Sequence, residues 1–512
     1  MTLLQRCFAY LLLLTVVGSV RAQPLPREEI VRLTDAALPA ALAQLTEFLA
    51  IPNDGHYPEQ VEANLAWCKA TFLDKGFAVT RIATPGMPLL FAERQIDAAL
   101  PTVLFYLQID GQPVDTAAWD QPDPYQVVYK RKGADGTYAT VPTPIPAATG
   151  IPYDPELRLF ARSASDSKGP AVAFLTALDV LAAEGLAPAY NVKVIMDFQE
   201  ELGSDDLPGA VAAQRELFEA DFLVILDGTR HVSNEPTLTF GARGIATVTL
   251  EVFGPRTALH SGQYGNFAPN PVFAAARLLA ALKDEQGRVM IPGFYDGVEL
   301  TAADKLEMNR VPETREDIRV MVGIAENEAL GDTYQEALQY PSLNVRGLAA
   351  GWVGQEVRTL IPDRVTIEID MRLVPETPGE RQVELLRQFI AGQGYHFVDS
   401  VPTEEERLRY PKLISFTSSL GSVPFRTALG TPIDRWLTAA ISHALGKEPV
   451  RMRTTGGSQP LGPFVNRLGL PAVSLRIPNP DNSIHAPNEN LRLGNFREGI
   501  LECIGVLVTP IQ

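Results

Sequence analysis

Apolar runs that end abruptly in acidic residues are the most regular pattern along this chain. TVLFYLQID ends in Asp110, NVKVIMDFQEE ends in Glu200 and Glu201, and DFLVILDGT carries Asp227 after its last apolar residue. Short, nearly continuous apolar runs of this kind predict strands that are buried on both faces. In an open α/β sheet the ligand crevice lies beyond the carboxyl ends of such strands, so these acids are expected to lie near a ligand.

Helical patterns alternate with these strands. Apolar residues recur at helical spacing over residues 27–49, where Pro39 predicts a break or kink, over residues 60–75, and along GPAVAFLTALDVLAAEGL after Asp166. FAVTRI and PLLFAER are two further predicted strands. The alternation predicts the α/β class, with a mainly parallel sheet that carries helices on both faces.

The pattern changes at about residue 237. ATVTLEVFGP and VTIEIDMRLVP alternate as strands with one exposed face do, and NPVFAAARLLAALKDE and GERQVELLRQFIAG are helical. These segments predict an α+β lid domain over residues 237–402, inserted into a catalytic domain formed by residues 23–236 and 403–512. The acidic, weakly patterned tract 286–340 is assigned to the same insert.

Residues 1–22 have the features of a secretory signal peptide, because Arg6 precedes an apolar run and Val20-Arg21-Ala22 offers a cleavage site. We therefore expect an exported protein, periplasmic or secreted, with no membrane association after cleavage. Removal of Arg6 and Arg21 takes the formal charge from −17 to −19. So negative a chain argues against nucleic acid as a partner, since the phosphate backbone demands a basic surface.

Two of the three cysteines remain after signal cleavage. Cys68 and Cys503 lie in the apolar, helix-like segments AWCKATF and LECIGVL, where a buried free thiol is commoner than a disulfide. Export permits a bond between them. Free thiols are the expected state, and a disulfide is the alternative.

The acids that end the strands, together with Asp166 at a predicted helix start, indicate a metal site. Taken alone, Glu200 and Glu201 would be explained as a solvated pair at the start of a loop or helix. Several carboxylates that converge on one sheet edge repel one another and raise one another's pKa unless a cation neutralises them. Metal binding is the economical explanation of the whole set.

Eight short motifs follow one another along nearly the whole mature chain. They are YLQIDGQPV, ARSASDSKGP, FQEELGS, VILDG, ALHSG, MRLVP, TGGSQP and IHAPNE. The order of these motifs, with an insert where the family has its lid domain, resembles that of a zinc-dependent peptidase family. This family includes carboxypeptidase G, succinyl-diaminopimelate desuccinylase, aminoacylase and carnosine dipeptidase. The chain is most similar to the carnosine dipeptidase branch.

The resemblance implies roles for residues of the catalytic domain. Asp166 would bridge two metal ions, Glu201 and His485 would complete one zinc site, and Asp227 would belong to the other. Carboxylate and imidazole ligands suit zinc, and a catalytic zinc keeps one position open for water. Glu200 would be the general base that takes a proton from this water, and the metals would stabilise the tetrahedral oxyanion.

The resemblance also implies contacts with the substrate. Arg372 in MRLVP would bind the substrate carboxylate through its guanidinium fork, although the sequence alone supports a salt bridge at a strand end equally well. Gly456, Gly457 and Ser458 would form a backbone cradle for the same group. His260 in ALHSG would reach the substrate bound in a partner subunit, which implies a homodimer.

One departure from the family pattern affects the second metal site. The family has a histidine two residues before an aspartate, and this chain has Gln108 before Asp110. A glutamine oxygen is a weak zinc ligand compared with imidazole, so one zinc site is expected to be complete and the second impaired unless another residue, such as His231, substitutes. Asp110 is kept and is assigned with Glu200 to the catalytic residues.

These features predict an exported zinc-dependent metallohydrolase, dipeptidase-like or carboxypeptidase-like, which cleaves the amide bond of dipeptides or N-acyl amino acids with a metal-activated water. The alternative is a non-catalytic binding protein that retains the fold and the acids. Such a protein would have lost its catalytic activity when it lost the histidine ligand. The retained Glu200 favours the enzyme, because a decayed site has little reason to keep its base.

Overall fold

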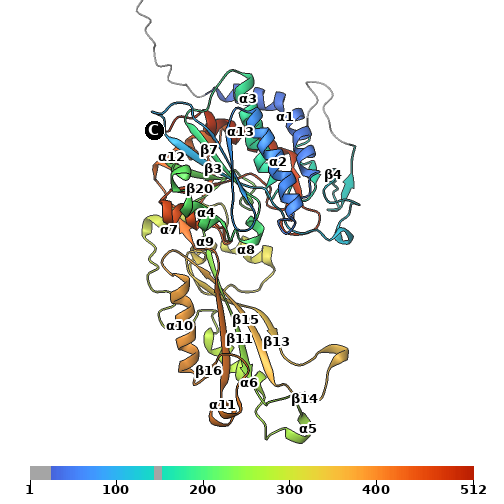
Figure 1. Cartoon of the computed structure of the whole chain (residues 1–512), viewed down its shortest axis with the longest axis vertical. Helices are drawn as coiled ribbons and strands as arrows, with labels where there is room; N and C mark the ends of the chain where they lie inside the picture. The colour runs from blue at the N-terminus through green and yellow to red at the C-terminus, as the bar shows by residue number, and fades with distance from the viewer. Residues whose placement is uncertain (1–24, 143–152, 512) are drawn as a thin grey trace, which may run out of the picture.

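Two sheets organise the computed structural model, which describes residues 25–142 and 153–511. The larger sheet contains eight strands in the order β1 (Ala78–Ile82), β2 (Leu89–Arg94), β7 (Asn191–Asp197), β3 (Thr102–Gln108), β8 (Phe222–Ile225), β20 (Ala472–Arg476), β9 (Thr237–Thr239) and β19 (Val450–Met452). Figure 1 shows it in one lobe of an elongated molecule, with a second, smaller sheet in the other. The expected signal peptide, residues 1–22, lies outside the described ranges.

The centre of the larger sheet is parallel. β7, β3, β8 and β20 pair in parallel with one another, and antiparallel pairs join β1, β2 and β9 to them. Their apolar side chains belong to two separate cores, one on each face of the sheet. The chain therefore has the expected α/β class, with a mainly parallel sheet.

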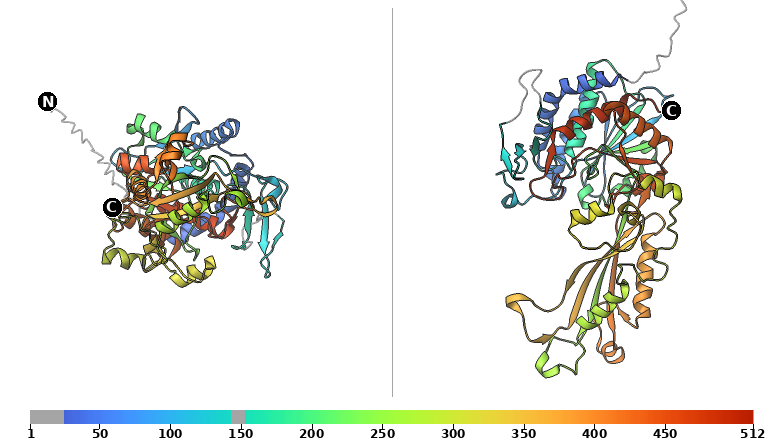
Figure 2. Two further views of the ribbon diagram at one scale, coloured as in Figure 1. Left: turned by 90° about the horizontal axis from the view of Figure 1, so that it is seen from below. Right: turned by 180° about the vertical axis from the view of Figure 1, so that it is seen from behind.

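Helices cover both faces of this sheet, as predicted. One face carries α1 (Arg27–Leu49), α2 (Pro58–Asp74), α3 (Lys168–Ala183), α12 (Pro432–Leu445) and α13 (Leu493–Val508). The other carries α4 (Leu207–Ala213) with the short helical segments η3 (Arg215–Phe218) and η5 (Pro463–Arg467). Figures 1 and 2 show α1, α3 and α13 gathered on one side of the lobe. α1 continues through Pro39, so of the predicted break or kink the break does not occur.

The smaller sheet is the inserted α+β unit. Its five strands, in order, are β13 (Ser342–Ala349), β15 (Arg364–Leu373), β11 (Gly244–Phe253), β17 (Leu413–Leu420) and β16 (His396–Val398). α6 (Pro271–Leu282) and α10 (Gly379–Gly392) pack against one face, and buried residues alternate with partly exposed ones along β11 and β15. The alternation in the sequence arises because this sheet has one covered face.

The chain crosses between the two lobes at positions that differ from the predicted boundaries. β9 still belongs to the larger sheet, and β17 still belongs to the smaller one. The crossings lie next to β10 (Gly241–Ala242) and β18 (Phe425–Arg426), which pair with each other. The sequence did not indicate β17, because this strand ends in four exposed residues and lacks the alternation of a half-buried strand.

The tract 286–340 also contacts the larger lobe. It forms the short helices α7 (Ala302–Met308), α8 (Arg315–Val322) and α9 (Tyr334–Ala337). Glu307 pairs with Arg451 of β19 at 2.8 Å, and Asp304 pairs with Arg453 at 3.2 Å. The tract is therefore a bridge between the lobes as well as an elaboration of the insert.

The remaining elements are short. They are β4 (Val128–Lys132), β5 (Tyr138–Thr140), β6 (Arg158–Phe160) and β21 (Asn490–Arg492) in a four-stranded sheet, the paired β12 (Leu259–His260) and β14 (Leu360–Ile361), the helices α5 (Ser261–Tyr264) and α11 (Glu404–Arg409), and the turns η1 (Thr116–Ala118), η2 (Glu200–Leu202) and η4 (Gly354–Glu356). Cys68 and Cys503 are buried free thiols, as expected. Along the described residues, no helix combines the length and apolar character needed to span a membrane.

A buried ion pair fixes the last helix of the chain to the larger sheet. Arg230 follows β8, and its Nη2 lies 2.6 Å from Oε1 of Glu502 in α13, with both side chains fully buried. Burial raises the pKa of Glu502 to about 7, although the nearby Arg230 opposes this shift. A carboxyl group with a raised pKa takes up a proton on folding, so its contribution to stability is lost as the pH rises through that value.

We expect Arg230→Ala to lower the free energy of unfolding by about 3–5 kcal/mol, because it leaves Glu502 buried without its partner. The loss should be larger at about pH 8.5 than at about pH 5.5, since the unpaired carboxyl must ionise in the folded state. Urea unfolding at both pH values measures the loss in the free energy of unfolding. The control is Arg256→Ala, which removes a pair with 68% and 72% exposed side chains and should cost less than about 1 kcal/mol. Equal losses in the two variants would contradict this account.

Candidate metal centre

Three side chains from distant parts of the sequence meet at the carboxyl edge of the larger sheet. Asp166 precedes α3, Glu201 lies in η2 just after β7, and His485 lies in the loop between β20 and β21. The His485 Nε2 atom lies 2.9 Å from Oδ2 of Asp166 and 3.1 Å from Oε2 of Glu201. Their ligand atoms all lie within 4.8 Å of one another, and no other such group of three occurs among the described residues.

These donors fit a single divalent metal. Two carboxylates and one imidazole are ligands that zinc accepts, and three protein ligands leave a position for water. The Oε1 atom of Glu201 is buried and has no hydrogen-bond partner in the described part of the chain, so it is an acceptor that lacks a donor or cation. Hydrogen bonds to Asp166 and Glu201 raise the pKa of His485 to about 10, so these carboxylates attract a positive charge to this position.

Glu200 lies beside this group and makes no side-chain hydrogen bond to any described residue. Burial and the charges of Asp227 and Asp166 raise its pKa well above the usual value of a glutamate. Asp110 holds the turn that carries it, because its Oδ1 and Oδ2 accept the backbone N–H groups of Glu200 and Glu201 at 3.0 and 3.1 Å. The structure thus places Asp110 as an anchor of η2.

Glu489 is a functional residue that the sequence analysis missed. Its carboxylate is fully buried and accepts the backbone N–H groups of Ser163, Ser165 and Asp166 at 2.8–2.9 Å, and Arg162 Nη1 at 2.9 Å. It therefore fixes the loop that presents Asp166. The signal was the single acid of IHAPNE, four residues after His485, but its role depends on a contact between segments 323 residues apart.

The described residues do not assemble a comparable second site around Asp227. The Oδ1 atom of Asp227 accepts the Ser167 hydroxyl at 2.9 Å, and Oδ2 accepts Nε2 of Gln459 at 2.8 Å. Gln108, at the end of β3, is buried, and its Nε2 has no partner among the described residues. His231 does not substitute for the missing ligand, because its ring nitrogens lie 2.9 Å from Ser233 Oγ and 2.8 Å from Glu313 Oε2. The side chains around Asp227, Gln108 and His231 among them, therefore do not form a ligand set that fits a second metal.

The structure brings together most of the residues assigned to the substrate. Arg372 of β15 donates from Nη1 to the Ser458 hydroxyl at 3.0 Å. Gly456 and Gly457 precede Ser458 in the same loop after β19. His260 is not part of this group, because it caps α5, and Figures 1 and 2 show α5 at the far end of the smaller sheet.

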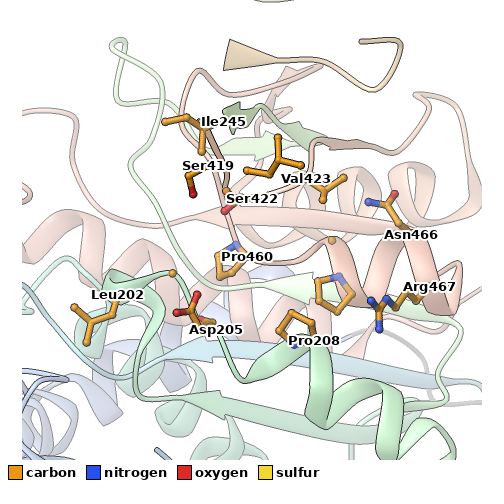
Figure 3. Close-up of a pocket in the computed structure, with 16 residues that line it drawn as sticks. Leu202, Asp205, Pro208, Ile245, Ser419, Ser422, Val423, Pro460, Asn466 and Arg467 are labelled. Atoms are coloured by element: carbon orange, nitrogen blue, oxygen red, sulfur yellow. The ribbon is translucent and has the colours of Figure 1, made fainter. Parts of the chain in front are cut away.

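A pocket of about 600 Å³ opens between the two lobes beside these residues. Figure 3 shows Leu202 and Asp205 on one side and Ile245, Ser419 and Ser422 on the other. Pro460 lines it directly after Gln459. The pocket borders the turn that carries Glu200 and Glu201, and it offers room for a small molecule at the junction of the lobes.

The fold and site together define a class of protein. A parallel sheet whose strand ends carry clustered carboxylates and one histidine, with an inserted α+β lobe above it, is the arrangement of a metal-dependent hydrolase. The model of the peptidase family M20/M25/M40 matches residues 138–506, so the chain belongs to this family. It is a metal-dependent peptidase, and the family resemblance of its eight motifs is confirmed.

Similar proteins agree with this assignment. The Cys-Gly metallodipeptidase of Schizosaccharomyces pombe is 26% identical over 427 residues, which cover 81% of each chain. The Beta-Ala-His dipeptidase of Homo sapiens is 27% identical over 427 residues, covering 81% of this chain and 76% of that protein. The M20 metallo-carboxypeptidase of Sulfolobus solfataricus superposes with a TM-score of 0.74 at 26% identity, covering 92% and 98% of the two chains. Human carnosine dipeptidase 1 has the same fold, with a TM-score of 0.69 at 23% identity over 94% and 99% of the two chains.

We expect Glu489→Gln to weaken metal binding by about 10- to 100-fold, because an amide cannot accept all the N–H groups that hold the Asp166 loop. Competition with a chelator of known affinity measures this change. Glu156→Gln is the control, since Glu156 is 66% exposed and pairs with Arg492 at the surface. An unchanged affinity in a folded Glu489→Gln variant would show that the loop holds Asp166 without this carboxylate.

Proposed function

We propose that this chain is an exported zinc dipeptidase that hydrolyses the amide bond of dipeptides, with N-acyl amino acids as a related substrate class. The observation that carries the proposal is the cluster of Asp166, Glu201 and His485 beside the unpaired carboxyl group of Glu200. Two relatives that this chain matches over most of their length are named as dipeptidases. Their names support dipeptides as the substrate class. The non-catalytic alternative has no support in these comparisons.

Asp166, Glu201 and His485 would hold a zinc ion, which would supply Lewis-acid chemistry to the scissile carbonyl and the attacking water. Glu200 accepts the proton of the attacking water and returns it to the leaving amine. A general base works best when its pKa is near the working pH, and burial with neighbouring acids shifts the pKa of Glu200 upward from its usual value. Asp110 keeps this carboxyl group in place through the backbone of η2.

The substrate carboxylate is proposed to bind at Arg372. The guanidinium lies 3.0 Å from the Ser458 hydroxyl, and the backbone of Gly456 and Gly457 continues the same surface. A planar fork of N–H donors suits a carboxylate, and a hydroxyl group can add a further hydrogen bond. A free carboxylate recognised next to the scissile bond restricts the substrate to short peptides and acylated amino acids.

The proposed enzyme is a homodimer in which the smaller lobe serves the neighbouring subunit. His260 lies at the end of the smaller lobe that is remote from the chain's own acids, which supports a role outside its own subunit. β13 is an edge strand of the five-stranded sheet, and it exposes Val345 and Leu348. An edge strand with exposed apolar residues suits pairing with a second copy.

Glu200→Gln should lower kcat by at least about 100-fold while metal content stays at the wild-type level, because Glu200 acts as a base and not as a ligand. Glu201→Gln is the contrasting variant and should lose both activity and metal. Hydrolysis of a dipeptide panel with and without chelator, beside metal analysis, measures both quantities. Cleavage that persists after the metal is removed would overturn the proposed mechanism.

His260→Ala and Glu200→Gln should each be inactive, and a mixture of the two should regain activity after subunit exchange. Each heterodimer then contains one complete site, so a random mixture should approach about a quarter of the wild-type rate. Dipeptide hydrolysis before and after exchange, with exchange verified by differently tagged chains, is the measurement. A mixture as inactive as its parents would rule out a site shared between subunits.

A further inference from the structure

Arg476 is a buried arginine at the carboxyl edge of the larger sheet, and the proposed function does not use it. Only 6% of the residue is exposed. Its Nε and Nη2 atoms are enclosed and have no hydrogen-bond partner among the described residues. A buried guanidinium without partners is costly unless a negative field stabilises its charge. Arg476 therefore requires a nearby source of negative charge.

The strand register places Arg476 next to Asp227. β8 pairs in parallel with β3 through Tyr106 and Ile225, and with β20 through Ser474 and Ile225. Two residues beyond this row are Gln108 at the end of β3, Asp227 just after β8 and Arg476 at the end of β20. Asp227 thus lies between the weak ligand Gln108 on one side and the cation of Arg476 on the other.

Gly228 provides the space that the guanidinium occupies. A Cβ atom on Gly228 would lie 1.2 Å from Arg476 Nη1 and 2.5 Å from its Cζ, so no side chain fits there. The guanidinium therefore lies directly over the backbone next to Asp227. Burial lowers the pKa of Arg476, and the charges of Asp227, Asp166 and Glu200 act against this shift.

The side chains around Asp227 donate hydrogen bonds to it and do not form a set of metal ligands. Both of its oxygens accept hydrogen bonds from neutral groups, the Ser167 hydroxyl and the Gln459 amide. The ligand cluster found in the described residues contains Asp166, Glu201 and His485 and excludes Asp227. The position of the family's second metal therefore lacks both its histidine and a free carboxylate.

We propose that the Arg476 guanidinium replaces the second metal ion as a fixed cation, so that the centre works with one metal. Arginine remains protonated at any physiological pH and cannot dissociate from the site. It would supply positive charge opposite Asp227 while the single metal is held by Asp166, Glu201 and His485. This inference rests on the proposed metal site and assigns Arg476 as a positioning residue.

The proposal makes Gln108 and Arg476 interdependent. A histidine at position 108 restores a ligand, but the guanidinium still repels a second divalent ion. Substitution of Arg476 alone removes the repulsion, but the glutamine remains a weak ligand. The two changes together should open a second site, and neither alone should do so.

Zinc per chain, measured by mass spectrometry after dialysis against a fixed zinc buffer, tests this interdependence. We expect about one zinc for the wild type and for Gln108→His, and about two for the double variant Gln108→His/Arg476→Met. The matched control Gln108→His/Arg476→Lys keeps the charge and should remain at one. Circular dichroism verifies that each variant is folded.

Two tightly held zinc ions in the wild type or in Gln108→His would overturn the proposal, because the guanidinium would then not exclude the metal. A folded double variant that stays at one zinc would overturn it as well. If the double variant does not fold, anomalous scattering from zinc in crystals of the wild type decides, since a peak beside Asp227 refutes the proposal and a single peak between Asp166, Glu201 and His485 supports it. A wild type that binds no zinc refutes the proposed metal site itself.

Discussion

Negative charges concentrated at the end of one sheet must be balanced, and this requirement governs the arrangement of the site. Burial and neighbouring acids raise the pKa of Asp110, Asp166 and Glu200 well above the usual values. Cations near these groups favour their ionised forms and so oppose this upward shift. A metal at Asp166 and its neighbours, together with Arg476, would keep the acids ionised. The chemistry of the centre therefore depends on two cations, a bound metal and the arginine at the end of β20.

Backbone amides hold the acids of the site in place. Asp110 accepts two N–H groups of the turn that carries Glu200, and Glu489 accepts three N–H groups of the loop that carries Asp166. Such donors are fixed by the chain, so they orient the ligands at little further entropic cost. The chain itself therefore holds the two loops that present the ligands.

The sequence predicted the class of fold and the acids of the site because both depend on local patterns. An apolar run that ends in an acid identifies a buried strand together with the acid at its carboxyl end, as for Asp110 and Asp227. The role of Glu489 could not be predicted, since it depends on contact with a loop 326 residues earlier. The edges of the insert were misplaced for a related reason: β17 is defined by its partner β11, and its own residues carry little periodicity.

Gln108 alone is compatible with a decayed centre and with a remodelled one. A decayed centre that lost a metal would leave Asp227 and its neighbours without compensation. Here a buried arginine lies on the other side of Asp227, above a glycine whose missing side chain makes room for it. The strands that carry Gln108 and Arg476 are 368 residues apart in the sequence and meet only through β8. Charge compensation of Asp227 by this arginine favours a remodelled centre, in which a permanent cation replaces an exchangeable one.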